Sequence, residues 1–248
     1  DIIYLETIRQ TGDIQFSLMP FINSESNFSG KVSLLTIYSS QKIDLIEMMP
    51  ILQNMGFYVY DELTARVGTK SDLMAYIHSF RVADIHQRKI NEGSLGDLII
   101  DLLGHIFSKQ TENDRLNGLV LQAGLDWRQI NLLQTYRNLY IQLGARYGKE
   151  KIDTVLLSYP NMAQHLVAYF EAKFDPSLKL SVQKRQETVL SQQKKEFLES
   201  LSSVKEIADD IIFKRLFNLM DATLRTNYFI PKESDSFISI KLNSSQST

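Results

Sequence analysis

Residues 117–176 read NGLVLQAGLDWRQINLLQTYRNLYIQLGARYGKEKIDTVLLSYPNMAQHLVAYFEAKFDP, and this stretch decides the fold of the second half of the chain. Its apolar residues recur every three or four positions, which is typical of amphipathic helices. Asp126 precedes one such pattern as a candidate N-cap, Gly144 ends it, and Pro160 stands where a further helix begins. Because the connections are short, we expect three or four antiparallel helices in a compact bundle.

Helical patterns continue on both sides of this stretch. Residues 94–107 (SLGDLIIDLLGHIF) carry one broad apolar stripe, which predicts another helix. Residues 178–224 predict one long helix or two joined helices, and their first half is very polar, as in helices that bridge two bodies or lie against a partner. The apolar positions close to a heptad seam are Leu190, Phe197, Leu201, Val204, Ala208 and Ile211. We therefore assign residues 91–230 to a helical domain.

The first third of the chain alternates with the period of strands. Residues 13–20 and 31–38 predict two strands, with a loop at 23–30 between them. Residues 57–67 and 73–83 predict two more strands, joined by residues 67–72.

A helix is predicted between these two pairs of strands, within residues 40–57. Ser40 is a candidate for its N-cap, and Pro50 predicts a kink or an early end. Gly56 is placed to adopt the left-handed conformation that ends a helix after Met55. The order β, β, α, β, β predicts an α+β fold for residues 1–90: a small antiparallel sheet with a helix on one face, like ACT or ferredoxin-like domains.

The end of the chain contains a further strand pattern. FISIKL (237–242) alternates, yet no preceding segment offers it an obvious pairing edge, so we assign residues 231–248 to a tail that belongs to a following domain. Arg225 to Tyr228 are expected to end a helix, either as an ordinary helix end or as a docking element for that domain. Because the chain starts at Asp1 and stops in KLNSSQST, we also expect it to be a piece of a longer polypeptide.

Composition excludes several classes of function. The chain has 248 residues with 44% hydrophobic content, which is enough for one or two domains, and we favour two. A net charge of -2 and a pI near 6.1 argue against a nucleic-acid partner and against a membrane surface. No apolar run approaches the roughly 20 residues that span a bilayer, and the first residues do not resemble a signal peptide.

The chain contains no cysteine, which excludes disulfides, thiolate metal sites and cysteine nucleophiles. Cysteine-free composition is compatible with a reducing cytoplasm.

Candidate catalytic and metal-binding residues are few. The four histidines, His78, His86, His105 and His165, lack the spacing of zinc sites, and ordinary surface or hydrogen-bonded roles are favoured over metal binding. The acidic pairs Asp209 with Asp210 and Asp97 with Asp101 could act as acid and base if burial raised one pKa, but helical periodicity favours a solvated face.

Phosphate-binding and hydrolase motifs are also missing from the sequence. No GxGxxG, GxxxxGK[ST] or GxSxG occurs, and Gly93 and Gly96 do not directly follow a strand. The basic residues near Lys194 are interleaved with glutamates, which is typical of a solvated helix. Trp127, the only tryptophan, is expected to pack a helix start into the bundle. We therefore expect no catalytic, cofactor-binding or metal-binding residue in this chain.

Three blocks of sequence resemble the large bacterial NAD-specific glutamate dehydrogenases. They are MMPILQNMGFYVYDE (48–62), residues 117–144 together with 160–176, and DATLRTNYF (221–229) before FISIKL. The resemblance implies a region with ACT-like and helical parts that precedes the catalytic domain of an enzyme that oxidises L-glutamate with NAD. It also implies a cytoplasmic homo-oligomer, NAD bound outside this segment, and an amino-acid effector as a possible ligand.

Three functional hypotheses remain open. The first is a non-catalytic regulatory or assembly segment of such a dehydrogenase, which contacts the downstream catalytic domain of the same chain. The second is a stand-alone ACT-like module that senses an amino acid. The third is a structural interaction domain whose 178–224 helix pairs with a partner.

Overall fold

The structure, a computed structural model, describes most of the chain. The described residues are 2–21, 31–69, 72–86, 88–90, 93–230 and 237–243, without the side chains of residues 69 and 72–74. The chain forms two compact units, Asp1–Trp127 and Arg128–Thr248. The first unit extends past residue 90, where the sequence suggests a domain boundary, so it also contains the first elements of the predicted helical region.

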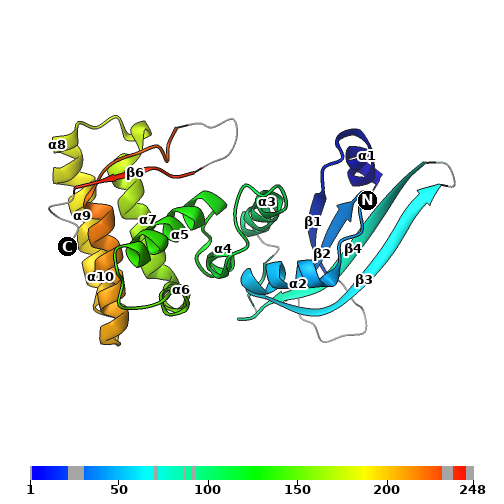
Figure 1. Cartoon of the computed structure of the whole chain (residues 1–248), viewed down its shortest axis with the longest axis horizontal. Coiled ribbons are helices and arrows are strands. Elements are labelled where there is room, and N and C mark those ends of the chain that lie inside the picture. The colour runs from blue at the N-terminus through cyan, green and yellow to red at the C-terminus, as the bar shows by residue number, and fades with distance from the viewer. Residues whose placement is uncertain are drawn as a thin grey trace. The chain divides into compact units, whose positions relative to one another are not determined.

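The first unit is built on a four-stranded antiparallel sheet. Its strands are β1 (Gln15–Pro20), β2 (Val32–Ser39), β3 (Phe57–Thr69) and β4 (Asp72–Asp84), in the order β1-β2-β4-β3. In Figure 1, β3 and β4 run side by side as a long ribbon, and α2 (Leu45–Asn54) lies next to β3. The predicted α+β class and the order β, β, α, β, β are confirmed. The predicted loop at 23–30, and part of the one at 67–72, lie outside the described residues.

The ends of α2 differ in part from the prediction. Asp44 is the N-cap residue and makes no side-chain hydrogen bond there, so the assignment of Ser40 as the cap is wrong. Pro50 lies inside the helix, which continues to Asn54, so the predicted early end does not occur. Gly56 has a φ of 88°, as predicted for the residue that leaves this helix.

Helices cover both faces of the sheet. Successive residues of a strand face opposite sides, and Phe16 is opposite Ile37 in the register. The Phe16 ring contacts Phe107 of α3 (Leu95–Phe107), whereas Tyr38, the neighbour of Ile37, stacks on Tyr4 of α1 (Ile2–Thr11). The helix α1 is therefore an addition to the predicted fold, on the face opposite α3.

The rest of the first unit is helical. The predicted helix at 94–107 is confirmed as α3, which buries four apolar side chains of its stripe, Ile99, Leu102, Leu103 and Ile106. Two short helices follow, η1 (Arg115–Gly118) and α4 (Leu119–Ala123). α3 packs against both β1 and α4.

The second unit is mainly helical. Its helices are α5 (Trp127–Gln142), α6 (Lys149–Ser158), α7 (Pro160–Phe174), η2 (Pro176–Leu178), α8 (Val182–Arg185), η3 (Gln186–Leu190), α9 (Ser191–Leu201) and α10 (Ile207–Asp221). The helices predicted within 117–176 are confirmed, and Pro160 occupies the first turn of α7. α7 packs against α6, α9 and α10, so it forms the centre of the unit.

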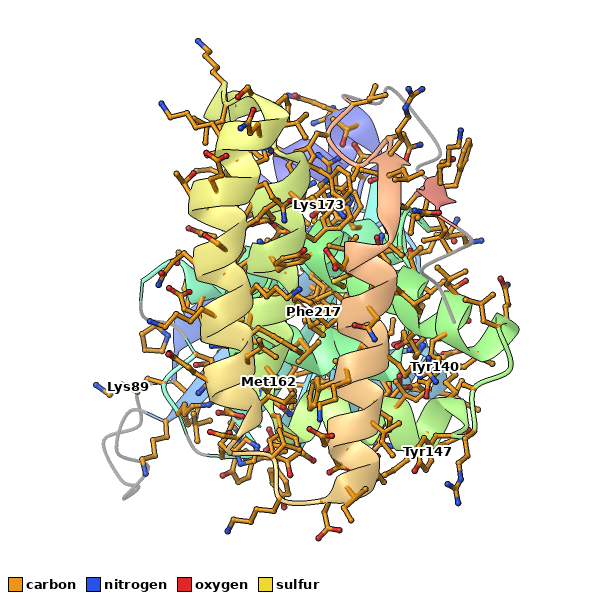
Figure 2. The ribbon with its side chains drawn as sticks, turned by 90° about the vertical axis from the view of Figure 1, so that its left-hand side faces the viewer. Lys89, Tyr140, Tyr147, Met162, Lys173 and Phe217 are labelled. Carbon is orange, nitrogen blue, oxygen red and sulfur yellow. The ribbon has the colours of Figure 1, made fainter. Side chains whose placement is uncertain are left out.

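The polar region 178–224 forms two helical segments. The first runs without a break from α8 through η3, which has π-helical geometry, to α9, and the second is α10. The expected seam is buried at Leu190, Phe197 and Leu201, but it does not continue through Val204 and Ile211. Phe197 instead stacks on Phe217 of α10, and Figure 2 shows Phe217 directed toward α9.

The strand at the end of the chain has a partner within the chain. β6 (Ile240–Leu242) pairs antiparallel with β5 (Thr223–Thr226), which directly follows α10. The prediction that FISIKL lacks a pairing edge is therefore wrong, and so is the expectation that Arg225 to Tyr228 end a helix. The sequence misled because Leu216, Leu219, Met220 and Leu224 keep a helical spacing across the true helix end at Asp221.

Candidate functional site

His78 is buried between three segments of the first unit. Its Nδ1 lies 2.9 Å from Glu62 Oε1, and the backbone N–H of Ile43 donates to its Nε2 at 3.4 Å. Since Nε2 accepts a hydrogen bond, the ring proton sits on Nδ1 and is donated to Glu62. Burial alone raises the pKa of Glu62, but hydrogen bonds from Thr64 and His78 outweigh it and lower that pKa overall. His78 therefore joins β3, β4 and the segment before α2.

The remaining histidines have different surroundings. His86 is exposed, and His165 pairs with Ser200 Oγ at 2.8 Å. His105 lies on α3, where it lines a pocket with Asp101. Within the part of the chain that the structure describes, no group of three or more metal-ligating side chains gathers.

Asp97 and Asp101 are exposed, as expected, whereas the two members of the pair Asp209 and Asp210 differ from each other. Asp210 pairs with Lys214 at 2.7 Å on the surface, as expected for a solvated helical face. Asp209, however, is only 6% exposed and pairs with Lys151 at 2.5 Å, so its assignment to a solvated face is wrong. This carboxylate links α10 to α6 and is held by a salt bridge.

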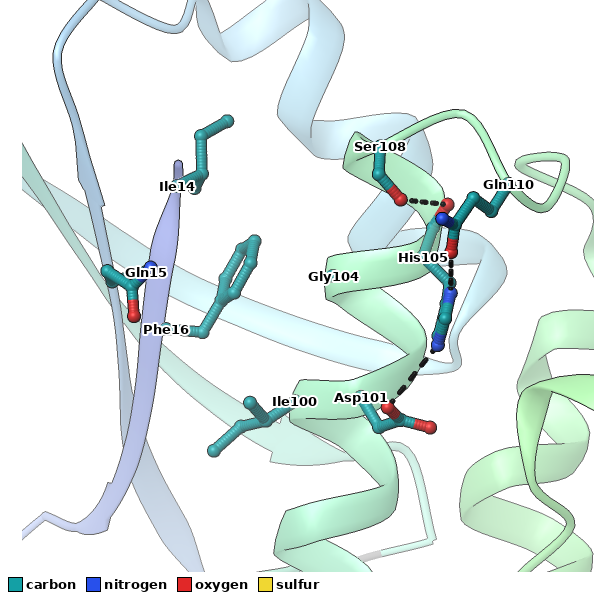
Figure 3. A pocket seen from close by; sticks show the side chains of 9 residues that line it. All are labelled: Ile14, Gln15, Phe16, Ile100, Asp101, Gly104, His105, Ser108 and Gln110. Atoms are coloured by element: carbon teal, nitrogen blue, oxygen red, sulfur yellow. Dashed lines mark hydrogen bonds and ion pairs between the residues drawn. The ribbon is translucent and has the colours of Figure 1, made fainter. Parts of the chain in front are cut away.

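A pocket of about 360 Å³ opens between β1 and α3 in the first unit. Its lining residues are Ile14, Gln15, Phe16, Ile100, Asp101, Gly104, His105, Ser108 and Gln110. Figure 3 shows Phe16 pointing from β1 toward Gly104, whereas Asp101 and His105 lie along another side of α3. The pocket thus has an apolar side and a polar side.

His105 connects the polar side of this pocket to its surroundings. Its Nδ1 contacts Gln110 Oε1, and its Nε2 lies 3.4 Å from Asp101 Oδ1. The imidazole ring also stacks on Trp127, with ring centroids 3.9 Å apart. The sequence predicts that Trp127 packs a helix start, and its partner is this histidine.

In the second unit, polar contacts concentrate where α10 meets β5. Lys173 of α7 donates to the carbonyl oxygens of Met220, at 3.3 Å, and of Asp221, which are among the last carbonyls of α10. The Tyr169 hydroxyl of the same helix donates to the Asp221 carboxylate. Burial lowers the pKa of Lys173, although the charge of Asp221 opposes this, and burial raises the pKa of Tyr169.

α5 holds the same junction from its own side. The Tyr136 hydroxyl lies 2.6 Å from Thr223 Oγ1, and Thr223 in turn donates to Leu219 O at 2.8 Å, so the tyrosine is the donor in the first bond. Both side chains are completely buried, and burial raises the pKa of Tyr136. Arg128 donates to Tyr228 O, and its guanidinium carbon lies 5.2 Å from the centre of the Tyr228 ring.

The side chain of Asn227 bonds to the segment that leads into β6. Its side-chain N–H donates to Phe237 O at 3.1 Å, and its side-chain oxygen accepts from the backbone N–H of Ser239 at 2.7 Å. We call the set of residues from Met220 to Tyr228, with β6, the α10–β5 junction. Contacts from both α5 and α7 fix this junction in place.

A buried ion pair stabilises the other end of the second unit. Arg137 of α5 and Asp153 of α6 are each 1% exposed, and Arg137 Nη1 donates to Asp153 Oδ1 at 2.7 Å. Lys149 donates to the second oxygen of Asp153 at 3.0 Å. Nothing in the sequence distinguishes Arg137 and Asp153 from surface charges, because each residue finds its partner on a different helix.

Comparison with known protein families gives three matches that follow one another along the chain. Residues 18–95 match the ACT3 domain of glutamate dehydrogenase, and residues 111–176 match its helical motif 3. Residues 196–248 match the catalytic domain of the bacterial NAD-glutamate dehydrogenases. This last match begins inside the region assigned above to helices, and it includes α10, β5 and β6. The expected resemblance and the ACT-like interpretation of the sheet are confirmed.

Curated relatives extend the resemblance over nearly the whole chain. The NAD-specific glutamate dehydrogenase of Halomonas elongata is 28% identical over 99% of this chain, which covers 15% of that protein. The one from Pseudomonas aeruginosa is 30% identical over 83% of this chain and 13% of its own length. The one from Mycobacterium tuberculosis is 28% identical over 89% of this chain and 14% of its length. The chain therefore spans about one seventh of the relatives it matches.

Proposed function

Because the chain belongs to the family of the large NAD-specific glutamate dehydrogenases, we propose that it is a non-catalytic assembly and regulatory segment of such an enzyme. The parent enzyme oxidises L-glutamate to 2-oxoglutarate and ammonia and reduces NAD. NAD binds in the parent enzyme outside this segment, and no residue of this chain takes part in the chemistry. The role of the segment is to hold the first elements of the catalytic domain.

The α10–β5 junction is the observation that carries this proposal. α5 and α7 lie within the match to helical motif 3, whereas α10, β5 and β6 lie within the match to the catalytic domain. Lys173, Tyr136 and Arg128 therefore connect the helical motif to the start of the catalytic region through hydrogen bonds. Such contacts fix where the catalytic domain begins, which is what an assembly element must do.

The buried charged groups of the second unit support a structural role. A catalytic acid or base needs access to substrate and a pKa suited to proton transfer. Asp153 and Asp209 are instead buried and paired with Arg137, Lys149 and Lys151. These partners bind the carboxylate oxygens.

Incubation of the chain with L-glutamate and NAD tests the non-catalytic role. We expect no NADH absorbance above that of buffer, and addition of an active glutamate dehydrogenase to the same cuvette serves as the positive control. Turnover by the isolated chain contradicts the proposal.

The proposal also covers the compartment and the oligomeric state of the parent enzyme. We place it in the cytoplasm as a homo-oligomer, and among the described residues no helix is long and apolar enough to cross a membrane. Multi-angle light scattering of the parent enzyme measures its mass. A strict monomer at high concentration contradicts assembly into a homo-oligomer.

A second candidate function is an amino-acid sensor, which is supported by the match of residues 18–95 to an ACT3 domain and would use the pocket between β1 and α3. Asp101 in its lining suits an ammonium group, but the lining residues include neither lysine nor arginine to pair with a carboxylate. Calorimetric titration of the chain with the amino acids distinguishes the candidates. Saturable binding of one of them favours the sensor over a purely structural segment.

A further inference from the structure

The pocket between β1 and α3 exists because one residue of α3 is a glycine. Residues four apart are neighbours on a helix, so Ile100, Gly104 and Ser108 form one row along α3. All three line the pocket, and the missing side chain of Gly104 leaves a gap in the middle of the row. A Cβ built on Gly104 meets no atom within 4 Å.

Neither packing nor backbone geometry accounts for this glycine. Glycine is the least favourable helix residue after proline, and in helix interiors it often permits close contact with another element. No described atom approaches the position of a Cβ at residue 104, and its φ is not in the left-handed region. The consequence of the glycine is therefore open space beside Phe16 (Figure 3).

The chemistry of the lining selects a ligand with a cationic group. Ile14, Phe16 and Ile100 offer apolar contact. Asp101 offers a carboxylate whose side chain is 52% exposed, and neither lysine nor arginine occurs among the lining residues. An anionic ligand thus meets only repulsion from a formal charge, whereas an ammonium group gains an ion pair.

His105 completes the polar side of the pocket. Its Nδ1 contacts Gln110 Oε1, and its Nε2 lies 3.4 Å from Asp101 Oδ1. An ammonium group that pairs with Asp101 therefore lies beside the imidazole ring.

We propose that this pocket binds a small protonated amine whose body is compact and apolar and which lacks a carboxylate. The apolar body lies over Gly104 against Phe16, and the ammonium group pairs with the Asp101 carboxylate beside His105. The volume of about 360 Å³ falls at the lower end of the range of roughly 300–1,000 Å³ for small-molecule sites. The site is separate from the α10–β5 junction, so it stands or falls independently of the assembly role.

Trp127 provides a built-in reporter of binding. It is the only tryptophan of the chain, and it stacks on His105, which lines the pocket. Titration of the chain with 2-phenylethylamine should change the tryptophan fluorescence in a saturable way. Titration with 3-phenylpropionate, which has a similar body and the opposite charge, should give no saturable change.

Three variants test the site. Asp101→Asn should weaken binding of 2-phenylethylamine by at least about tenfold, because it removes the charge from the acceptor. Gly104→Leu should abolish binding because its side chain fills the gap, and Gly104→Ala, the matched control, should retain it. Both residue 104 variants should fold, since leucine and alanine are good helix formers and the space is open. Circular dichroism checks that each variant is folded.

Three results contradict the proposal. The first is equal or tighter binding of 3-phenylpropionate, which removes the selection for a cation. The second is unchanged binding by a folded Gly104→Leu variant, which places the amine elsewhere. The third is the lack of any saturable fluorescence change with the amine, confirmed by the lack of shifts in the amide resonances of Gln15 and Gly104.

Discussion

The buried polar pairs of the second unit contrast with the edge strand β3 and the pocket of the first unit. The second unit buries charged and hydroxyl groups and pairs them with each other, as at Arg137 with Asp153 and Tyr136 with Thr223. The first unit also buries paired groups, His78 and Asp84, but two other regions of it leave side chains exposed. Its edge strand β3 exposes four large apolar side chains, Tyr58, Tyr60, Leu63 and Val67, and its pocket keeps Asp101 half exposed.

The buried pairs of the second unit hold its helices together, whereas the exposed groups of the first unit can bind a ligand or another part of a longer chain. Buried and mutually paired polar groups specify one arrangement of α5, α6, α7 and α10, because each lost partner leaves an unsatisfied group. Exposed apolar and acidic groups do not fix the arrangement of the elements within the unit, and they remain available to ligands or to other parts of a longer chain. The comparison predicts large effects of substitutions at the buried pairs of the second unit and small ones at the exposed strand and the pocket of the first.

The largest effect is expected at the buried ion pair. Asp153→Ala leaves Arg137 buried without its carboxylate partner and should lower the free energy of unfolding of the second unit by about 3–5 kcal/mol. Urea unfolding followed by circular dichroism measures this loss, and hydrogen exchange of peptides from 128–230 assigns it to the second unit.

Two controls sharpen this prediction. The double variant Arg137→Met with Asp153→Leu removes both charges and should be much less destabilised than the single variant. Glu199→Ala breaks the exposed pair with Lys195 and should change stability by less than about 0.5 kcal/mol. If Asp153→Ala behaves like Glu199→Ala, the contrast between paired and open groups disappears.

The next effect is expected at the α10–β5 junction. Thr223→Val removes the acceptor of the Tyr136 hydroxyl and leaves that hydroxyl buried and unsatisfied, which should destabilise the second unit by about 1–3 kcal/mol. Tyr136→Phe leaves Thr223 bonded to Leu219 O and should cost only about 0.5–1.5 kcal/mol. Urea unfolding of both variants compares them, and the reverse order of the two losses is the result that this interpretation forbids.

Alkaline pH should weaken the second unit in a way that depends on Tyr169. Burial, and then the hydrogen bond to Asp221, raise the pKa of Tyr169 above its usual 10.0 in the folded chain. The stabilisation by this group is therefore complete below the pKa of the unfolded chain and is lost as pH rises through the higher folded pKa. Tyr136 acts in the same direction, whereas the lowered pKa of Lys173 acts in the opposite one.

Tyr169→Phe isolates this contribution. Between about pH 9 and about pH 11 the variant should lose less stability than the parent chain, as measured by thermal unfolding at each pH. Parallel losses in both chains over that range rule out a role for Tyr169 in the pH dependence.

The smallest effect is expected in the first unit. Gly104→Ala should raise its stability by about 1 kcal/mol or less, because alanine is the better helix former and its Cβ meets no atom within 4 Å. Thermal unfolding measures the gain. A clear loss of stability means that the space above Gly104 is filled and that the first unit is less open than described.

The sequence predicts most of the fold because the hydrophobic period is a local property. The four strands of the sheet and the helices within 117–176 follow their periods, and Gly56 ends α2 as its residue type indicates. The sequence fails where tertiary contacts override local pattern. Residues 223–226 keep a helical spacing, yet they form β5 because β6 pairs with them.

The candidate sites are mostly invisible to sequence reasoning for the same reason. Tyr136 and Thr223 are 87 residues apart, and no local pattern indicates that their hydroxyls meet. Asp209 has the spacing of a surface residue, and only the fold shows that it is 6% exposed and paired with Lys151. The sequence contains one local sign of the pocket, the glycine Gly104 within the apolar helix α3. This glycine indicates a pocket only once β1 is known to lie beside α3.

The central claim is that the helical motif and the start of the catalytic region form one unit. Hydrogen exchange tests this claim most directly. Peptides from α7 and from residues 222–230 are followed in increasing denaturant, in the parent chain and in Lys173→Met. We predict that both peptides exchange through one common opening in the parent chain, and that Lys173→Met makes residues 222–230 exchange sooner. Independent opening of residues 222–230 in the parent chain, unchanged by Lys173→Met, contradicts the account.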